Sequence, residues 1–154
     1  MTDKTGDYRN GRHVVYNLNV HLVLVTKYRR GVITDRVRED IIQTTRETCE
    51  RHDVLIEAID GEDDHIHMLI SYPPKLAVSN LIAAIKTTTS KAVRASNYPE
   101  VRKALDGGAF WSPSYFVSST GGASLETVKQ YVENQRNPNR KVGRPVAVSS
   151  PPQK

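Results

Sequence analysis

The clearest strand in this chain, around which the rest of the fold can be arranged, is Asp64-His65-Ile66-His67-Met68-Leu69-Ile70. Side chains along an extended strand point alternately to its two faces. The apolar side chains at positions 66, 68 and 70 therefore share one face, which the pattern predicts to be buried. His65 and His67 share the opposite face, where two neighbouring imidazoles can bind a metal ion.

The sequence on either side of this strand predicts three more strands and three helices. Pro73 and Pro74 end the histidine strand, because proline has no N–H group for a ladder hydrogen bond. Ser79 can cap the helix that follows, and Ser124 can cap the last one. The expected strands are residues 17–26, 54–60, 65–72 and 110–118, and the expected helices are residues 35–52, 79–95 and 125–136.

The order of these elements predicts an α+β fold. A β-α-β-β-α-β order is typical of the ferredoxin-like arrangement, a four-stranded antiparallel sheet with two helices on one face. The face with the histidines is left open, and the additional C-terminal helix, which carries Tyr131, can pack there. The expected inner faces of the first two helices are Val37, Ile41, Thr44 or Thr45 and Thr48, and Leu81, Ile82, Ile85, Thr89, Ala92 and Val93.

Length, composition and charge describe an ordinary soluble protein with a basic surface. The chain has 154 residues, of which 38% are hydrophobic and 25% charged, and its formal net charge of +5 favours a polyanionic partner such as nucleic acid. No apolar run approaches the roughly 20 residues that span a membrane, and the N-terminus does not resemble a signal peptide. With Cys49 alone there is no internal disulfide and no zinc site built from cysteines, which fits a reducing cytoplasm.

Three regions are expected along the chain. Residues 1–12 are polar and predict a flexible N-terminus. Residues 13–137 form the folded domain. Residues 138–154 are rich in proline, serine and basic residues, which predicts a disordered tail.

Two histidines are too few for a closed structural metal site, so a further ligand must come from elsewhere. Gln135 can give a carbonyl oxygen. Two nitrogens and one oxygen with open positions describe a catalytic site for a divalent ion that acts as a Lewis acid. Ligand softness alone leaves Zn, Co, Ni, Mn and Mg open.

Tyr131 lies one helical turn before Gln135, so the two side chains share a face of the expected helix. A phenol is a poor nucleophile at its usual pKa of about 10. Beside a divalent cation it can lose its proton more easily and attack a phosphorus. Attack on a DNA phosphodiester would leave a covalent phosphotyrosine and a free 3′-OH, and the strand could then be rejoined without ATP.

Other interpretations of the same residues exist. A lone His-x-His motif is more often structural than metal-binding, and a tyrosine on a helix is more often part of the packing. The combination of His65, His67, Tyr131 and Gln135 on a small basic chain favours a catalytic site over these structural roles. The alternatives are a protein that binds DNA hairpins without moving DNA, and a metal-dependent hydrolase that activates water and does not need Tyr131.

These residues resemble the single-tyrosine HUH transposases of the IS200/IS605 insertion-sequence family, in which HUH denotes histidine, hydrophobic residue, histidine. The resemblance covers about residues 14 to 137. It is carried, in order, by His21-Leu22-Val23-Leu24-Val25-Thr26-Lys27-Tyr28-Arg29-Arg30, Asp64-His65-Ile66-His67-Met68-Leu69-Ile70, Phe110-Trp111-Ser112-Pro113-Ser114-Tyr115-Phe116-Val117 and Val128-Lys129-Gln130-Tyr131-Val132-Glu133-Asn134-Gln135.

The resemblance implies a DNA transposase that cleaves and rejoins single-stranded DNA at hairpin-bearing element ends. It implies Tyr131 as the nucleophile of a 5′-phosphotyrosine intermediate, and His65, His67 and Gln135 as ligands of Mg²⁺ or Mn²⁺. It also implies a homodimer, in many members with active sites shared in trans, in the bacterial or archaeal cytoplasm. Two departures are Asp63, where the family often has proline, and the longer tail; a domesticated relative that binds hairpins without transposition is the alternative.

Single-stranded DNA needs cations for its phosphates and aromatic faces for its bases. The end of the first strand offers both. The candidate DNA contacts are Lys27, Tyr28, Arg29 and Arg30 there, Lys86, Lys91 and Arg94 on the second helix, and Arg136, Arg140 and Lys141 towards the tail.

Overall fold

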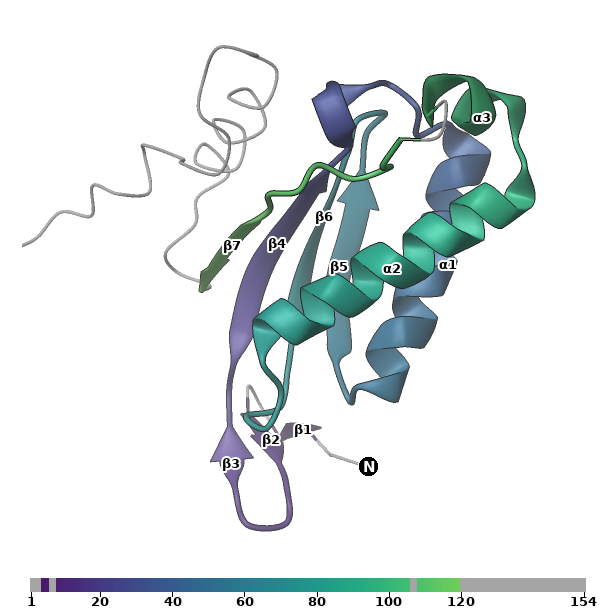
Figure 1. Ribbon diagram of the computed structural model, residues 1–154. Coiled ribbons are helices and arrows are strands. Elements are labelled where there is room, and N and C mark those ends of the chain that lie inside the picture. Colours follow the sequence, from purple (N-terminus) through teal and green to yellow (C-terminus); the bar gives the residue numbers. More distant parts are fainter. Residues whose placement is uncertain (1–3, 6–7, 106–107, 120–154) are drawn as a thin grey trace, which may run out of the picture.

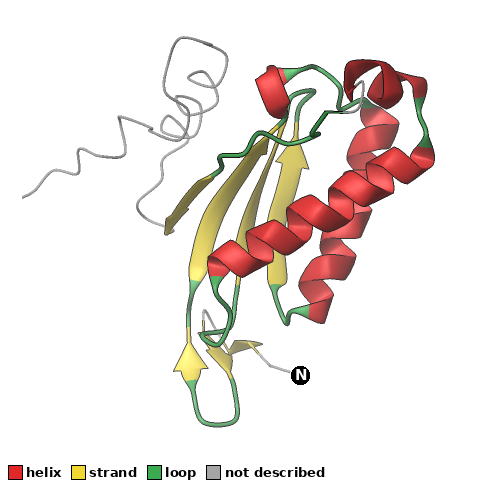
Figure 2. Cartoon of the chain, in the orientation of Figure 1, coloured by secondary structure: helices red, strands yellow, loops and turns green. Residues whose placement is uncertain are grey.

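The computed structural model describes residues 4–5, 8–105 and 108–119. These residues form a mixed α+β structure, with a four-stranded antiparallel sheet, three α-helices and a smaller three-stranded sheet (Figures 1 and 2). The expected tyrosine helix at 125–136 and the expected tail lie outside the described residues.

The four-stranded sheet consists of β4 (Asn19–Val25), β5 (Leu55–Gly61), β6 (His65–Ser71) and β7 (Phe116–Ser119) in the order β5-β6-β4-β7. Each neighbouring pair is antiparallel, and the central pair runs in register from Asn19 opposite Ser71 to Val25 opposite His65. The first three predicted strands are thereby confirmed. The fourth is shorter than expected, because Trp111 pairs with Thr26 in an isolated bridge and Pro113 separates that bridge from β7.

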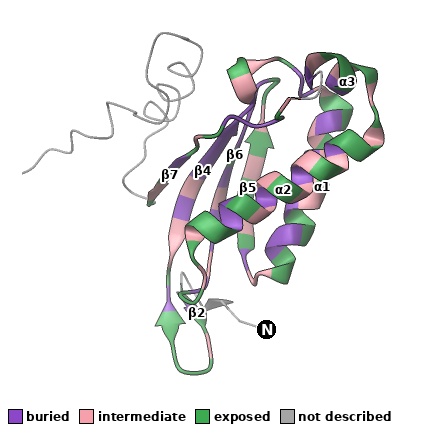
Figure 3. Ribbon diagram, viewed as in Figure 1, coloured by how far each residue is buried: buried purple, intermediate pink, exposed green. Residues whose placement is uncertain are grey.

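Helices α1 (Asp35–Arg51) and α2 (Val78–Ser96) cover one face of this sheet (Figure 1). The purple stripes in Figure 3 mark their buried sides. These are Val37, Ile41, Thr45, Thr48 and Cys49 on α1, and Leu81, Ile82, Ile85, Thr89 and Val93 on α2, which confirms the predicted inner faces nearly residue for residue. The core between helices and sheet includes Leu22, Leu24, Ile66, Met68 and Ile70.

Two details around α2 differ from the prediction. Ser79 is not the cap, since the helix begins at Val78 and Ala77 occupies the N-cap position without a side-chain hydrogen bond. The carbonyl of Ala77 already accepts from the N–H groups of Asn80 and Leu81, at 3.0 and 3.2 Å. After α2 ends at Ser96, Asn97 has a positive φ of 57°, and a short helix α3 (Pro99–Leu105) follows that we did not expect.

Residues 8–10, which lie within the segment 1–12 that we expected to be flexible, form a strand. Strands β1 (Lys4–Thr5), β2 (Tyr8–Asn10) and β3 (Val15–Tyr16) form the small antiparallel sheet. Arg9 is fully buried, and its guanidinium donates to the carbonyl oxygens of Ser71 and Asp53, each at 3.0 Å. This side chain therefore fastens the N-terminal strands to the main sheet, which the sequence pattern did not reveal.

Candidate metal and DNA-cleavage site

The two histidines lie side by side, as predicted, on the sheet face opposite the helices. His65 is opposite Val25 and His67 is opposite Val23, so these four side chains share that face. The imidazole rings are stacked with their centroids 5.8 Å apart. Val23, Val25 and Phe116 on the same face are buried, so the histidines have apolar neighbours.

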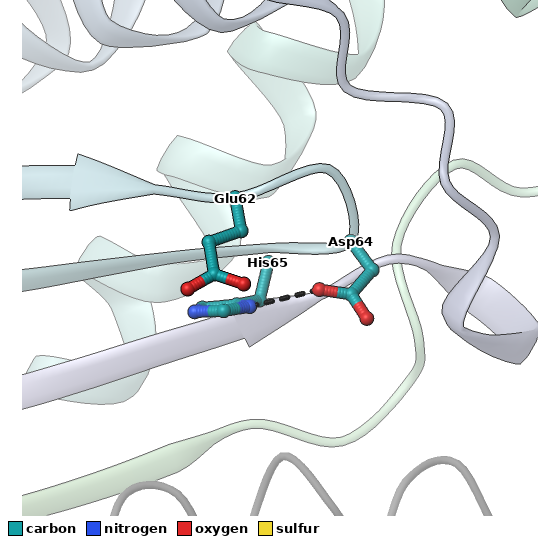
Figure 4. A group of neighbouring side chains, drawn as sticks. All are labelled: Glu62, Asp64 and His65. Carbon is teal, nitrogen blue, oxygen red and sulfur yellow. Dashed lines mark hydrogen bonds and ion pairs between the residues drawn. The ribbon is translucent and has the colours of Figure 1, made fainter.

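A buried carboxylate orients His65. Its Nδ1 lies 2.9 Å from Oδ1 of Asp64, and Asp64 also forms an ion pair with Arg29 (Figure 4). Both members of that ion pair are less than 10% exposed. Burial raises the pKa of Asp64, but the hydrogen bond from His65 and the Arg29 guanidinium outweigh it and hold the pKa below its usual value.

An ionised Asp64 can only accept a hydrogen bond, and this selects one tautomer of the His65 ring. The proton resides on Nδ1, where it is donated to the carboxylate, and Nε2 keeps its lone pair for a ligand. A carboxylate behind a histidine in this way is the usual outer-shell arrangement of metal-binding imidazoles. Arg29, Asp64 and His65 therefore form a hydrogen-bonded series that presents Nε2 of His65 to a ligand.

The turn after β4 positions Arg29. It is a short 3-10 helix η1 (Lys27–Arg29), and both Tyr28 and Arg29 have positive φ, at 59° and 54°. Non-glycine residues adopt this region at a cost of about 1 kcal/mol or more, and such residues concentrate at functional sites. The N–H group of Thr26 donates to the Asp64 carbonyl at 3.0 Å, and its hydroxyl donates to the Arg30 carbonyl at 2.8 Å, so Thr26 connects the turn to Asp64.

Glu62 is a functional candidate that our sequence reasoning missed. One possible ligand atom each from Glu62, Asp64 and His65 lies within 4.8 Å of the others. Figure 4 shows the Glu62 carboxylate next to the His65 ring. The acidic run Glu62-Asp63-Asp64 immediately before the histidines was the available signal, but we interpreted it only as a turn. Since Asp64 is already engaged by Arg29, Glu62 is the carboxylate better placed to bind an ion.

His67 completes a donor set that fits a divalent cation. Desolvation lowers the pKa of His67, and the neighbouring His65 lowers it further, which favours the neutral, ligating form. Two imidazoles and an exposed carboxylate are the hard and borderline donors that Mn, Mg or Zn accept. The described residues thus provide part of a site and leave positions for further ligands.

The other predicted site residues fall into two groups. Tyr131 and Gln135 lie outside the described residues, so their meeting with the histidines stays a prediction.

Of the candidate DNA contacts, Tyr28 and Lys91 are exposed, and Arg94, although exposed, donates to the carbonyl of Gly108. Three others are held by protein groups: Arg29 by Asp64, Arg30 by the Ala104 carbonyl, and Lys86 by the Ser112 carbonyl at 2.8 Å.

The sequence matches the family described as "Transposase IS200 like" over residues 14–135, which is most of the chain. This chain belongs to the IS200-like transposase family. Membership confirms the resemblance seen in the sequence, and a transposase of this family cleaves DNA and transfers strands.

Individual transposases agree with this assignment. The ISDra2 transposase TnpA of Deinococcus radiodurans is 26% identical over 131 residues, covering 85% of this chain and 93% of the relative. The transposase for insertion sequence element IS200 of Salmonella typhimurium is 27% identical over 146 residues, covering 95% and 94%. The match to both relatives is therefore nearly full-length.

Two solved structures have a similar fold. A 1.90 Å crystal structure of a candidate transposase from Deinococcus radiodurans R1 has a TM-score of 0.71 and 29% identity, covering 82% of this chain and 96% of the other. A REP-associated tyrosine transposase bound to a REP hairpin has a TM-score of 0.51 at 12% identity, covering 81% and 68%, and supports the fold alone. Within the described residues of this transposase, every helix is too short or too polar to cross a bilayer.

Proposed function

We propose that this transposase cleaves and rejoins single-stranded DNA at insertion-sequence ends through a 5′-phosphotyrosine on Tyr131. The observation that carries the proposal is the chain from Arg29 through Asp64 to His65, which presents a nitrogen lone pair beside His67. A buried ion pair that serves only to orient one imidazole is costly unless that imidazole binds something.

His65, His67 and Gln135 would hold Mg²⁺ or Mn²⁺, and Glu62 is close enough to contribute an oxygen. A bound divalent ion would supply Lewis acidity toward the scissile phosphodiester and the phenol. The protein side chains do the rest: Asp64 accepts a hydrogen bond from Nδ1 of His65 and so directs Nε2 toward the ion, and the apolar neighbours of the histidines limit competing water. Gln135 and Tyr131, one helical turn apart, would reach the site together from one helix face.

The proposed covalent step is a balanced exchange of phosphate esters. The oxygen of Tyr131 forms a bond to the phosphorus as its proton leaves, and the bond from phosphorus to the 3′ oxygen breaks. The 3′ oxygen takes up a proton and leaves as a free 3′-OH, while the 5′ side stays on the tyrosine. The reverse reaction with another 3′-OH rejoins the DNA, since the ester bond is conserved.

We also propose hairpins in the DNA as the recognised feature and a homodimer as the working unit, with the tyrosine helix serving either its own site or its partner's. The REP-associated relative bound to a hairpin supports hairpin recognition. A ferredoxin-like arrangement for the domain is supported by the strand order β5-β6-β4-β7 with antiparallel pairing throughout. A DNA-associated, cytoplasmic location is consistent with this function.

The test uses labelled single-stranded oligonucleotides taken from the DNA that flanks the gene, with Mg²⁺ or Mn²⁺. We expect a covalent protein–DNA band on a denaturing gel, with a 3′-OH on the released fragment that a polymerase can extend. The band should vanish in Tyr131→Phe and persist in Tyr8→Phe, a control that removes an exposed phenol from β2. A band that persists in Tyr131→Phe would show that the nucleophile is another residue.

The alternative is a domesticated relative that binds hairpins without transposition. It predicts tight hairpin binding with no covalent band under any divalent metal. A hydrolase that activates water instead predicts cleavage that survives Tyr131→Phe without any covalent band. The same gel and a parallel binding measurement therefore separate the three functions.

A further inference from the structure

A basic hollow of about 520 Å³ lies between α2 and the segment that leads from α3 to β7. We call it the basic groove, defined by Lys27, Lys86, Thr87, Ser90, Lys91 and Arg94. The lining residues include four cations and three residues with a hydroxyl, and none of those that the structure describes is a carboxylate. Ala109, Phe110, Trp111, Ser112 and Pro113 form the wall opposite α2. A hollow with this lining attracts phosphate groups.

The four cations are not equivalent. Lys86 is half-buried, and its ammonium donates to the carbonyls of Ser112 and Ser114 at 2.8 and 3.4 Å, so it contributes a fixed charge to the wall. Arg94 is tied to the Gly108 carbonyl. Lys27 and Lys91, by contrast, form no ion pair with any residue in the described part of the chain, and Lys91 is exposed. These two ammonium groups are the ones available to a ligand.

An exposed aromatic ring adjoins the basic groove. Tyr28 is 74% exposed, although its neighbour Arg29 points inward to Asp64. Its ring centroid lies 5.4 Å from Nζ of Lys27 and 5.2 Å from Cζ of Arg30. The left-handed turn thus holds an aromatic face outward between two cations, one of which also lines the groove.

We propose that the basic groove and Tyr28 together bind single-stranded DNA on its way to the histidine site. Phosphates would contact Lys27 and Lys91, and an unpaired base would stack on Tyr28, one residue from the arginine that orients Asp64. The exposed ring commits the proposal to a single strand, because the bases of a duplex are already stacked on each other. The inference rests on the proposed function and adds the path that the strand takes.

The charge component is tested by binding of the full-length protein to labelled oligothymidylate, which forms no hairpin. Fluorescence anisotropy is measured in EDTA over a range of salt concentrations, so that no cleavage occurs. Each lost phosphate contact should reduce the slope of log K against log salt by about 0.7 and weaken binding by about threefold. We expect this for Lys27→Ala and Lys91→Ala, and not for the controls Arg46→Ala and Lys75→Ala, whose side chains line a different hollow that also contains Glu50 and Asp53.

The stacking component is tested at Tyr28 with variants of similar size. Tyr28→Leu should weaken binding by about fivefold or more without changing the salt slope, whereas Tyr28→Phe should bind like the wild type, since it keeps the aromatic face. Equal affinities of the Leu and Phe variants would overturn the stacking contact.

Failure of this inference differs from failure of the proposed function. If Lys27→Ala and Lys91→Ala have the salt slope of the controls, or if the wild type does not bind oligothymidylate, the groove is not the DNA path, even if the Tyr131 adduct forms. If binding follows the groove variants but no adduct forms on any flanking DNA, the path stands and the transposition chemistry is what fails.

Discussion

The two ends of β6 are each held by a buried arginine paired with an aspartate, but the two pairs do different things. At the Ser71 end, Arg9 donates to two backbone carbonyls and to Oδ1 of Asp53 at 3.1 Å, and it lies over the Tyr16 ring at 5.2 Å. At the His65 end, Arg29 pairs with Asp64, which in turn holds His65.

The difference shows how a structural arginine and a site-forming arginine can be distinguished. Arg9 joins three segments of backbone, and its partner Asp53 is 36% exposed, so the pair closes the fold. The partner of Arg29 is buried, and it also forms a hydrogen bond with His65, whose imidazole lies on the sheet face opposite the helices. We therefore expect changes at Arg9 to affect stability alone, and changes at Arg29 to affect both stability and metal binding.

The largest effect is expected for Arg29→Met. Removal of the guanidinium leaves the buried Asp64 carboxylate without its cation, which costs about 3 kcal/mol of unfolding free energy. It also loosens the orientation of His65, for which we expect about a tenfold loss in Mn²⁺ affinity. Mn²⁺ binding is measured by calorimetry at low temperature on protein shown to be folded by circular dichroism.

Arg29→Lys should recover part of the Mn²⁺ affinity, because it restores the positive charge without the guanidinium geometry. An Arg29→Met variant with unchanged Mn²⁺ affinity would show that Asp64 does not orient a metal ligand, and the distinction between the two ends of β6 would be lost.

Arg9→Met is expected to cost a comparable 3 kcal/mol or so of unfolding free energy, because several hydrogen bonds to buried groups are lost. Chemical denaturation gives this value directly. Mn²⁺ affinity of the folded variant should equal that of the wild type, which makes Arg9→Met the matched control for the destabilisation caused by Arg29→Met. Asp53→Asn should cost less than Arg9→Met, since asparagine keeps an acceptor oxygen and tolerates the positive φ of 59° at this position, although the buried guanidinium loses its anion.

The sequence predicted the elements that have a clear hydrophobic period. Apolar residues recur at every second position in strands β4, β5 and β6, and at every third or fourth position in helices α1 and α2. In these elements the local pattern therefore agrees with the tertiary packing. The N-terminal strands have two or three residues each, too few for any period. Helix α3 has seven residues, and its burial of Val101 and Leu105 becomes visible only once α2 has turned at Asn97.

The candidate site was predictable only in part, for a physical reason. Alternation along a strand places His65 and His67 on one face, and the structure confirms it. The inward direction of Arg29 depends on two consecutive residues with positive φ, a conformation that nothing in Lys27-Tyr28-Arg29-Arg30 demands. A basic run followed by glycine indicates a surface, so the pattern predicts a DNA contact at Arg29 and gives no sign of its buried pair with Asp64.

Gly61→Ala tests the His65 end of β6 by steric pressure. A Cβ at Gly61 would lie 2.4 Å from the His65 carbonyl oxygen and 2.5 Å from Cδ1 of Ile66, so backbone must shift. We expect a loss of about 1–2 kcal/mol in unfolding free energy and a smaller loss of Mn²⁺ affinity than in Arg29→Met.

Gly11→Ala is the control at the N-terminal sheet, where the added Cβ would meet the end of the Val14 side chain at 2.8 Å. That side chain can move, so the cost should be smaller and Mn²⁺ affinity unchanged. If Gly61→Ala left both properties intact, the β5–β6 end would be more compliant than the contacts around His65 indicate.

The smallest effect is expected for a third arginine pair, which is exposed and serves as the reference for the two buried ones. Arg36 binds Glu100 of α3 with contacts of 2.8 and 2.9 Å, and Glu100 also accepts from the Thr34 hydroxyl at 2.7 Å. The hydrogen bond from Arg36, then that from Thr34, lowers the pKa of Glu100 from 4.5 to about 2. A carboxyl group with a depressed pKa stabilises the fold above its unfolded pKa, and this contribution is lost as the pH falls from 4.5 towards 2.

Glu100→Gln should therefore lower the urea midpoint slightly at pH 7 and less at pH 3. High salt should shrink the difference at pH 7, because exposed pairs are screened. A difference that grew on acidification would mean that α3 is held by something other than this ion pair.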